Sequence, residues 1–419
     1  MGAVRGFASS RSRESECFRL SSASTACSSP NVKAELRVAE FFAGIGLMRM
    51  GLEQAGWQVV WANDIDADKA RMYRGHYSKD AAHFHLGDIH ALAPSDLPTV
   101  TLATASFPCN DLSLAGARRG LAGEQSGAFW GFVEAIRGMG KRRPPLVLLE
   151  NVPGFLTSND GNDFRDACLA LNELGYAVDA FVIDAARFVP QSRQRLFVVG
   201  NRTPTTSIVN ETSSLLESTG RPAALSDFIL WHPEINWSLR PLPPLPTSDR
   251  KLPSIIETIS PNSTLWWSRD RCEYLLRQMS VRHHDIADRM IGGGTLSYGT
   301  VFRRVRKNRS MAELRTDGIA GCLRTPRGGS GRQILFVAGR GNFNVRLLTP
   351  RECARLMGAE DFEIDPSISS NQALFGFGDA VCVSVIRWIA ENYLAPLLAD
   401  ITAPKEIKTR QKSVRYGRA

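Results

Sequence analysis

Cys109 is the residue in this chain best placed for covalent chemistry, because it directly follows an apolar run. The run from Val100 to Ala105 predicts a buried parallel strand, and Pro108 ends it because proline cannot donate to a neighbouring strand. Cys109 then lies beyond the carboxyl end of a strand, where open α/β sheets place ligand chemistry. A thiol there can act as a nucleophile if its thiolate is stabilised. An inert buried cysteine is the alternative, and this stretch alone does not decide.

A second apolar run, residues 144–149, leads into Glu150 and again predicts a buried strand. The carboxyl ends of parallel strands meet at one edge of a sheet, so Glu150 and Cys109 can face the same pocket. The alternative is that Glu150 caps a helix.

Three polar residues precede a further apolar strand, residues 196–200. Gln191, Arg193 and Arg195 alternate along the chain, so an extended backbone puts them on one face. Such a face suits a site that binds a phosphate or a base, whereas a charged sheet edge is the alternative.

A nucleotide-binding pattern occupies residues 36–64. It consists of a strand, the turn Gly44-x-Gly46, a helix that ends near Gly56, a second strand and Asp64. The full pyrophosphate fingerprint is missing, so a ligand with a ribose and no phosphates, such as S-adenosylmethionine, fits better. Asp88 could bind the adenine amino group. A purely structural glycine turn is the alternative.

Two basic segments lack regular periodicity. Residues 116–127 form a long glycine-rich loop that includes Arg118 and could close over a nucleic acid, or could simply be a surface loop. Residues 302–340 are rich in arginine and in turn residues, which predicts a smaller, irregular second domain that contacts phosphates. A solvated basic surface is the alternative.

Composition sets the outer limits. With 419 residues, 43% hydrophobic content and no apolar run long enough for a bilayer, we expect two or three globular domains. The net charge of +9 points weakly to a polyanionic partner. The eight cysteines show no C-x-x-C pair, so we expect no metal site and a reducing, cytoplasmic setting. Residues 1–35 are Ser-rich and are expected to be disordered, a transit peptide being the alternative.

Taken together, these segments resemble the DNA cytosine-5 methyltransferase family. The matching segments occur in the family's order and are Phe42-Ala43-Gly44-Ile45-Gly46, Asp64, Gly87-Asp88-Ile89, Phe107-Pro108-Cys109, Glu150-Asn151-Val152, Gln191-x-Arg193-x-Arg195, Leu348-Thr349-Pro350-Arg351-Glu352 and Gly378-Asp379-Ala380-Val381.

The resemblance implies an α/β, Rossmann-like fold of the S-adenosylmethionine-dependent methyltransferases, with a smaller, irregular target-recognition domain. The implied order is a catalytic domain (36–200), a target-recognition domain (201–345), a second catalytic part with a closing helix (346–400) and a basic tail (401–419). The first 35 residues form the disordered extension.

The resemblance also implies roles for individual residues. Cys109 would attack C6 of a flipped-out cytosine, Glu150 and Arg195 would bind the ring, and Arg193 would order the catalytic loop or contact phosphate. The residues implied to bind the cofactor are Phe42, Gly44, Gly46, Asp64, Ile65, Asp88, Ile89, Pro108, Asp379 and Val381. Those expected to bind nucleic acid are Ser113, Arg118, Gln191, Arg303, Arg304, Arg306 and Arg327.

We expect a monomer acting on double-stranded DNA in the bacterial cytosol, without a membrane, as part of a restriction–modification or phage-defence system. A cognate restriction endonuclease is the expected protein partner. Two alternatives stay open: a methyltransferase of transfer RNA, and an inactive DNA-binding protein on the same fold. One departure concerns the cofactor site, because the family commonly has Asn where this chain has Asp379.

Overall fold

The computed structural model describes residues 36–78, 81–108, 127–202, 215–306, 309–325 and 331–403. Within these ranges, a seven-stranded sheet has the order β3-β2-β1-β4-β5-β7-β6. Its strands are β1 Arg37–Phe41, β2 Gln58–Asp64, β3 Phe84–Leu86, β4 Leu102–Ala105, β5 Leu146–Asn151, β6 Ala177–Asp184 and β7 Gln194–Asn201. Strand β7 runs opposite to the other strands of the sheet, and the parallel strands β1, β2, β4 and β5 end at one edge.

The strands that position the predicted chemistry are buried along their length. Every residue of β4 and of β5 is buried, as expected for parallel strands covered on both faces. β4 ends at Ala105, three residues before Pro108, and β5 carries Glu150 as its penultimate residue. The predicted strand–turn order of both segments is confirmed.

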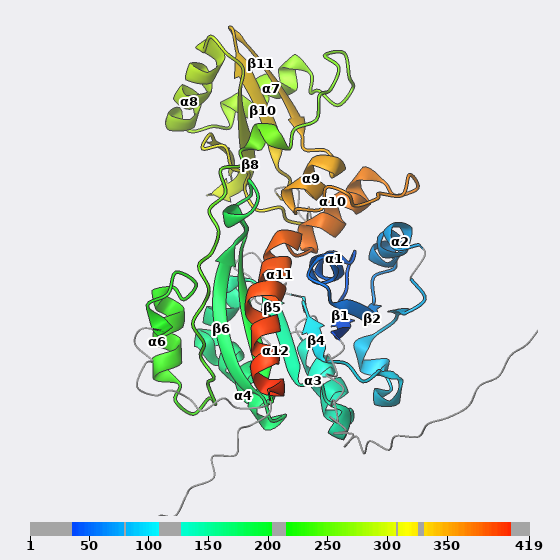
Figure 1. The fold of residues 1–419 in the computed structure, drawn as a ribbon. Helices are drawn as coiled ribbons and strands as arrows, with labels where there is room; N and C mark the ends of the chain where they lie inside the picture. The colour runs from blue at the N-terminus through cyan, green and yellow to red at the C-terminus, as the bar shows by residue number, and fades with distance from the viewer. Residues whose placement is uncertain are drawn as a thin grey trace, which may run out of the picture. The chain divides into compact units, whose positions relative to one another are not determined.

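Helices cover both faces of this sheet (Figure 1). One core joins α1, α11 and α12 to one face, and the other core joins α3 and α4 to the opposite face. The α1–α11 contact is close because a Cβ on Gly51 would lie 2.7 Å from the side chain of Ile386. The helices are α1 Leu47–Gln54, α2 Ala67–His76, α3 Ala128–Gly138, α4 Asn162–Glu173, α6 Ala223–Trp231, α7 Arg269–Arg277, α8 Val281–Gly292, α9 Pro350–Leu356, α10 Ser370–Asp379, α11 Val383–Ile389 and α12 Ala395–Thr402.

The closing helical stretch returns to the first βαβ unit, although it is far away in sequence. A π-helical segment, Ala390–Leu394, links α11 to α12. The stretch Ser370–Thr402 is long and apolar enough to span a membrane by composition, but 61% of its most apolar window is buried inside the protein. It is therefore a core element of this fold and not a membrane span.

The basic middle region is more regular than its sequence predicts. It forms a separate antiparallel sheet in the order β11-β10-β8-β9, with strands β8 Ser297–Arg306, β9 Arg309–Arg315, β10 Ile334–Gly339 and β11 Asn342–Leu347. Helices α7 and α8 share a hydrophobic core with this sheet. The prediction of an irregular domain is corrected in this respect. Arginines at exposed strand positions masked the alternating apolar residues that define the sheet.

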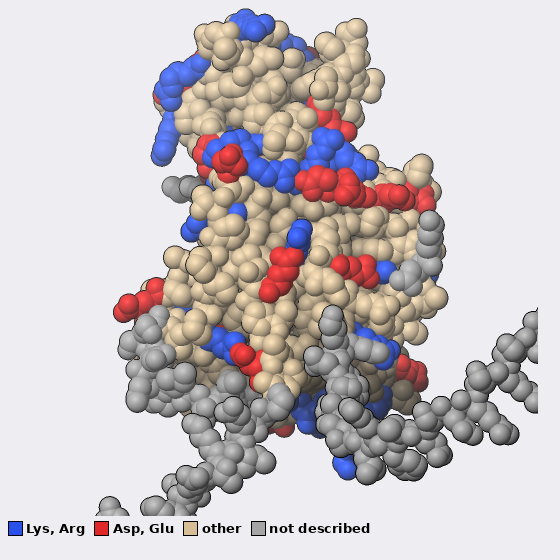
Figure 2. Space-filling view, viewed as in Figure 1, with Lys and Arg blue, Asp and Glu red and all other residues tan. Residues whose placement is uncertain are grey.

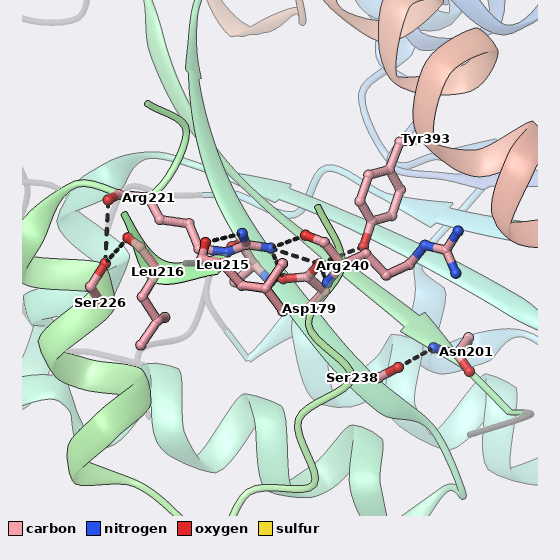
Figure 3. Close-up of polar contacts among 10 residues, drawn as sticks. Asp179, Asn201, Leu215, Leu216, Arg221, Ser226, Ser238, Arg240 and Tyr393 are labelled. Atoms are coloured by element: carbon pink, nitrogen blue, oxygen red, sulfur yellow. Dashed lines mark hydrogen bonds and ion pairs between the residues drawn. The ribbon is translucent and has the colours of Figure 1, made fainter. Parts of the chain in front are cut away.

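A buried polar network fastens residues 215–240 to strand β6 (Figure 3). Arg221 donates through one nitrogen to both oxygens of Asp179, at 2.7 and 2.9 Å. The hydroxyl of Tyr393, from the closing helical stretch, points to the same carboxylate and donates to it at 2.6 Å. The Asp179 carboxylate of β6 therefore binds both the chain beyond residue 215 and the closing helical stretch.

Candidate active site

Strand β1 ends in a tight glycine turn beside Asp64. The amide of Gly44 donates to Asp64 Oδ2 at 2.8 Å, and the amide of Asp66 donates to Oδ1 at 2.8 Å. Gly46 has a φ of +86°, and a Cβ there would lie 2.5 Å from the ring of Tyr77, so only glycine fits. Burial raises the pKa of Asp64, and Lys69 and the two amides oppose that effect.

Apolar side chains reach the solvent beside this acid. Ile65 is 68% exposed, and Leu86 at the end of β3 is also exposed. Phe42 is half-buried and takes a positive φ of 57°, a strained conformation for a non-glycine residue. Exposed apolar groups next to an acid suit an adenine ring and its ribose. The sequence analysis identified Ile65 and Phe42 but missed Leu86.

The remaining predicted cofactor residues occupy different environments. Asp88 is exposed and caps a short 3-10 turn by accepting from the amide of His90. Ile89 is buried, with its side chain close to Gly131 of α3, so the structure makes it a core residue. Val381 is buried too, whereas Pro108 is half-buried at the end of the described β4 segment.

Asp379 lies at the last position of α10 and forms an ion pair with Lys69 of α2. The distance between Lys69 Nζ and Asp379 Oδ2 is 2.8 Å. Burial lowers the pKa of Lys69, but Asp379 and Asp64 outweigh burial and raise it overall. Lys69 was not among the residues that the sequence analysis identified, and its position in the first turn of a polar helix gave no signal.

The residues of this site fit S-adenosylmethionine. Besides the apolar surface and Asp64, the site has Glu40 at the end of β1, a buried carboxyl group that receives no side-chain hydrogen bond in the described part of the chain and lies near the amide and the charge of Arg49. Burial raises the pKa of Glu40 to about 8. A buried acid of this kind can be satisfied by a ligand that carries positive charge, as S-adenosylmethionine does.

Glu150 and Arg195 meet at the carboxyl edge of the sheet. The distance from Arg195 Nε to Glu150 Oε1 is 2.9 Å, and their side chains are 15% and 8% exposed. Because Glu150 is directly opposite Phe197 on β7, Arg195 is its diagonal neighbour on the same face. Asn151 donates to the carbonyl of Phe107 at 3.3 Å, which fixes the end of β5 against the chain that leads to Cys109.

Several predicted residues fall outside what the structure describes. Cys109, Ser113, Arg118 and Arg327 lie in undescribed segments, and of Arg306 only the main chain is described. The described chain ends at Pro108 on one side of the Cys109 segment and resumes at residue 127.

Gln191 and Arg193 are both buried. Gln191 is fully buried; its Nε2 donates to the carbonyl of Leu356 and its Oε1 accepts from the amide of Leu323. Arg193 donates to the carbonyls of Leu323 and Gly378, at 2.8 and 3.1 Å. Both side chains are therefore bound by other parts of the protein. Their placement is decided by tertiary contacts with the segment around Leu323, which the local sequence pattern does not predict.

Cys322 is a thiol that the sequence analysis did not single out. Its sulfur accepts from Arg193 at 3.3 Å. Burial acts to raise the pKa of this thiol, but the charges of Arg193, Arg195 and Arg324 outweigh it and lower the pKa. The segment around Cys322 thus lies against the same arginines that border Glu150.

The basic residues of the second sheet divide into two kinds. Arg304 lies on a strand next to Glu313, with 3.5 Å between its Nε and Glu313 Oε2. Arg303 and Arg271 both lie over the ring of Trp267, and neither has an ion pair to an acid within the described ranges. Burial and the neighbouring Arg271 lower the pKa of Arg303. Two guanidinium groups held over an aromatic ring can bind a phosphate by donating hydrogen bonds to it.

The net charge does not form one broad basic field on the face shown in Figure 2. Basic and acidic side chains there lie next to one another in a band near the level of α9. In the part of the chain that is described, no group of three or more His, Cys, Asp or Glu residues could hold a metal ion.

Comparisons with known proteins identify the class. Residues 36–395 match the family model described as C-5 cytosine-specific DNA methylase. The chain is 26% identical to the type II methyltransferase M.Bsp6I of Bacillus sp. (strain RFL6), covering 87% of this chain and 100% of the relative. It is 25% identical to the type II methyltransferase M.HhaI of Haemophilus parahaemolyticus, covering 85% and 94%.

Solved structures agree on the fold. The S. pombe Dnmt2 methyltransferase has a TM-score of 0.58 and 18% identity, covering 86% of this chain and 99% of that chain. The fold and the family are those of an S-adenosylmethionine-dependent methyltransferase. The chain belongs to the C-5 cytosine-specific DNA methylase family and is a DNA cytosine-5 methyltransferase.

Proposed function

We propose that this chain methylates C5 of a cytosine flipped out of a specific duplex DNA sequence, with Cys109 as nucleophile. The Glu150–Arg195 pair carries this proposal, since it lies at the carboxyl edge of the sheet beside the strand that leads to Cys109. The Cys109 thiolate would attack C6 of the ring and form a Cys109–C6 bond. That attack turns C5 into a nucleophilic enamine carbon.

Glu150 would bind the N3 and amino edge of the flipped base, and so stabilise charge that enters the ring. Arg195 would hold the O2 side. S-adenosylmethionine, when bound, supplies the methyl group that C5 takes up. Loss of the C5 proton and breakage of the Cys109–C6 bond then release 5-methylcytosine and the free thiolate. Arg193 would act as a positioning residue through the carbonyls it holds.

The proposed cofactor site is built around Asp64, which would accept hydrogen bonds from the ribose. Ile65 and Phe42 would pack on the adenine, and Asp88 would accept from its amino group. The other proposed contributors are Gly44, Gly46, Ile89, Pro108, Asp379 and Val381. The exposure of Ile65 next to the amide-bound Asp64 supports this arrangement.

We also propose a revised domain boundary. The sequence places target recognition at 201–345 and the two catalytic parts at 36–200 and 346–400. The contacts of residues 215–240 with β6, which include a strand bridge between Val178 and Trp237, favour assigning this stretch to the catalytic part. Target recognition would then begin near residue 250, and Arg303 and Arg271 would contact the DNA backbone.

A role in restriction–modification is supported by relatives that are named type II methyltransferases. A cognate restriction endonuclease that cuts the same sequence would then be the functional partner. We propose that the chain acts as a monomer in the bacterial cytosol.

The experiment is bisulfite sequencing of plasmid DNA from a methylation-free host that expresses the chain, with Cys109→Ala as the control. We expect methylated cytosines within one short motif, and none with Cys109→Ala. Methylation that persists in Cys109→Ala would exclude Cys109 as the nucleophile. Turnover of transfer RNA in place of duplex DNA would overturn the proposed substrate.

A further inference from the structure

Lys69 is a cation placed where its own helix does not favour one. It is the third residue of α2, and Asp66 caps that helix by accepting from the amides of Asp68 and Lys69. The amino end of a helix carries partial positive charge, so a lysine in the first turn is unfavourable unless nearby acids compensate. Its position therefore needs a local cause.

The compensating acids come from two other elements. Asp379, at the end of α10, pairs with Lys69 at 2.8 Å, and Asp64, at the end of β2, lies close enough to raise the pKa of Lys69. Asp64 and Asp66 repel each other, and Lys69 opposes that repulsion. Lys69 thus stands among three carboxylates, one of which is the proposed ribose acceptor.

The same contact closes the cofactor turn. Gly376 of α10 packs so closely on Ile45 and Met72 that a Cβ there would lie 2.8 and 2.9 Å from them. Ile45 belongs to the glycine turn, and Met72 belongs to α2. The carboxyl end of α10 therefore sits on the turn, and the Lys69–Asp379 pair spans the edge of that contact.

We propose that Lys69 neutralises the charge of Asp379 where the end of α10 packs on the cofactor site, so that Lys69 is a positioning residue for S-adenosylmethionine. The pair replaces the neutral amide that resemblance to the family leads us to expect at position 379. A carboxylate at 379 without Lys69 would add a third uncompensated charge beside Asp64 and Asp66. This inference rests on the proposed cofactor site.

The variants separate a charge pair from a merely structural lysine. Lys69→Met leaves Asp379 unpaired beside Asp64, so we expect about tenfold weaker binding of S-adenosylhomocysteine. Asp379→Asn leaves Lys69 with Asp64 and Asp66, so we expect a loss of about threefold or less. The double variant has no charge at either position and should bind within about threefold of the unmodified chain.

The test is calorimetric titration of the full chain with S-adenosylhomocysteine, in the absence of DNA. Lys69→Arg should bind like the unmodified chain, and Arg71→Met on the same helix, where Arg71 pairs with Asp68, is the matched control. Rescue by the double variant supports the pair. The inference is overturned if Lys69→Met binds normally or if the double variant binds as weakly as Lys69→Met.

A methylation assay adds a second readout. Lys69→Met should raise the KM for S-adenosylmethionine and leave kcat nearly unchanged, since the pair touches neither Glu150 nor Arg195. A fall in kcat with an unchanged KM would contradict the proposal. If no variant methylates DNA, the proposed function fails, while the titration still decides the role of the pair.

Discussion

Two acid–arginine pairs lie on either side of strand β7 and have different functions: Glu150–Arg195 joins β5 to β7, and Asp179–Arg221 joins β6 to the chain that leads into α6. Glu150 and Arg195 meet at the carboxyl edge through one bond of 2.9 Å, and both side chains keep some exposure. Asp179 and Arg221 are buried, and the acid also accepts from Tyr393 and from the amide of Arg240.

The difference lies in how fully each carboxylate is satisfied. Five hydrogen bonds converge on the Asp179 carboxylate, two from Arg221 and one each from Tyr393, the amide of Arg240 and the amide of Ala180. Burial and the Asp179 charge raise the pKa of Tyr393, so the phenol stays protonated and donates. A carboxylate saturated in this way fixes the fold. The Glu150 carboxylate, by contrast, is bound by Arg195 and still borders solvent. This partial exposure suits binding of a base.

Breaking the buried pair should have the largest effect on stability. Asp179→Asn would leave the Arg221 guanidinium buried without its counter-charge, and we expect a loss of about 3–5 kcal/mol in the free energy of unfolding. Chemical denaturation measures this. Asp400→Asn removes an exposed partner of Arg240 and should cost less than about 1 kcal/mol. Equal effects of the two substitutions would mean that burial does not distinguish these pairs.

Breaking the proposed catalytic pair, Glu150 and Arg195, should affect turnover far more than stability. Glu150→Gln keeps the shape but removes the charge that would stabilise the ring, so we expect kcat to fall by about 10²–10³-fold. The free energy of unfolding should change little. Single-turnover methylation and denaturation of the same sample check both, with Glu134→Gln, a surface acid paired with Arg137, as the control. A large loss of stability with normal turnover would assign Glu150 a structural role.

Glu40 sharpens the comparison because it is a buried acid that receives no side-chain hydrogen bond in the described part of the chain. Its pKa is raised from 4.5 to about 8, so the folded state holds a proton that the unfolded state releases. Stability from this group is complete below about pH 4.5 and is lost as the pH rises to about 8. Glu40→Gln should remove this decline, measured as the free energy of unfolding from pH 5 to pH 8. An unchanged pH profile would show that Glu40 is ionised in the fold.

The arginines without an acid should show the smallest effect. Replacing Arg271 and Arg303 with Gln should weaken DNA binding and reduce the slope of log affinity against log salt by about one per lost phosphate contact. Arg387→Gln, on the distant α11 and paired with Glu391, is the control and should leave the slope unchanged. An unchanged slope in the double variant would place the phosphate contacts elsewhere.

The sequence by itself determined the strand-ending positions of the site. Apolar runs ending in Pro108 and Glu150, and the turn at Gly44 followed by Asp64, are local patterns with local causes. The helix over Pro350–Leu356 also has a local cause, since Thr349 and Glu352 form a capping box at its start. Hydrophobic periodicity, capping and turn chemistry act over a few residues, so a single sequence displays them.

Only the tertiary structure decided which polar side chains are buried and with what. Gln191 and Arg193 have the same spacing as Arg195, yet contacts with Leu323, more than a hundred residues away, withdraw them from solvent. Lys69 gained its partner Asp379 in the same way. The sequence does not show whether a charged side chain faces water or an opposite charge. Its environment comes from distant segments that the fold brings together.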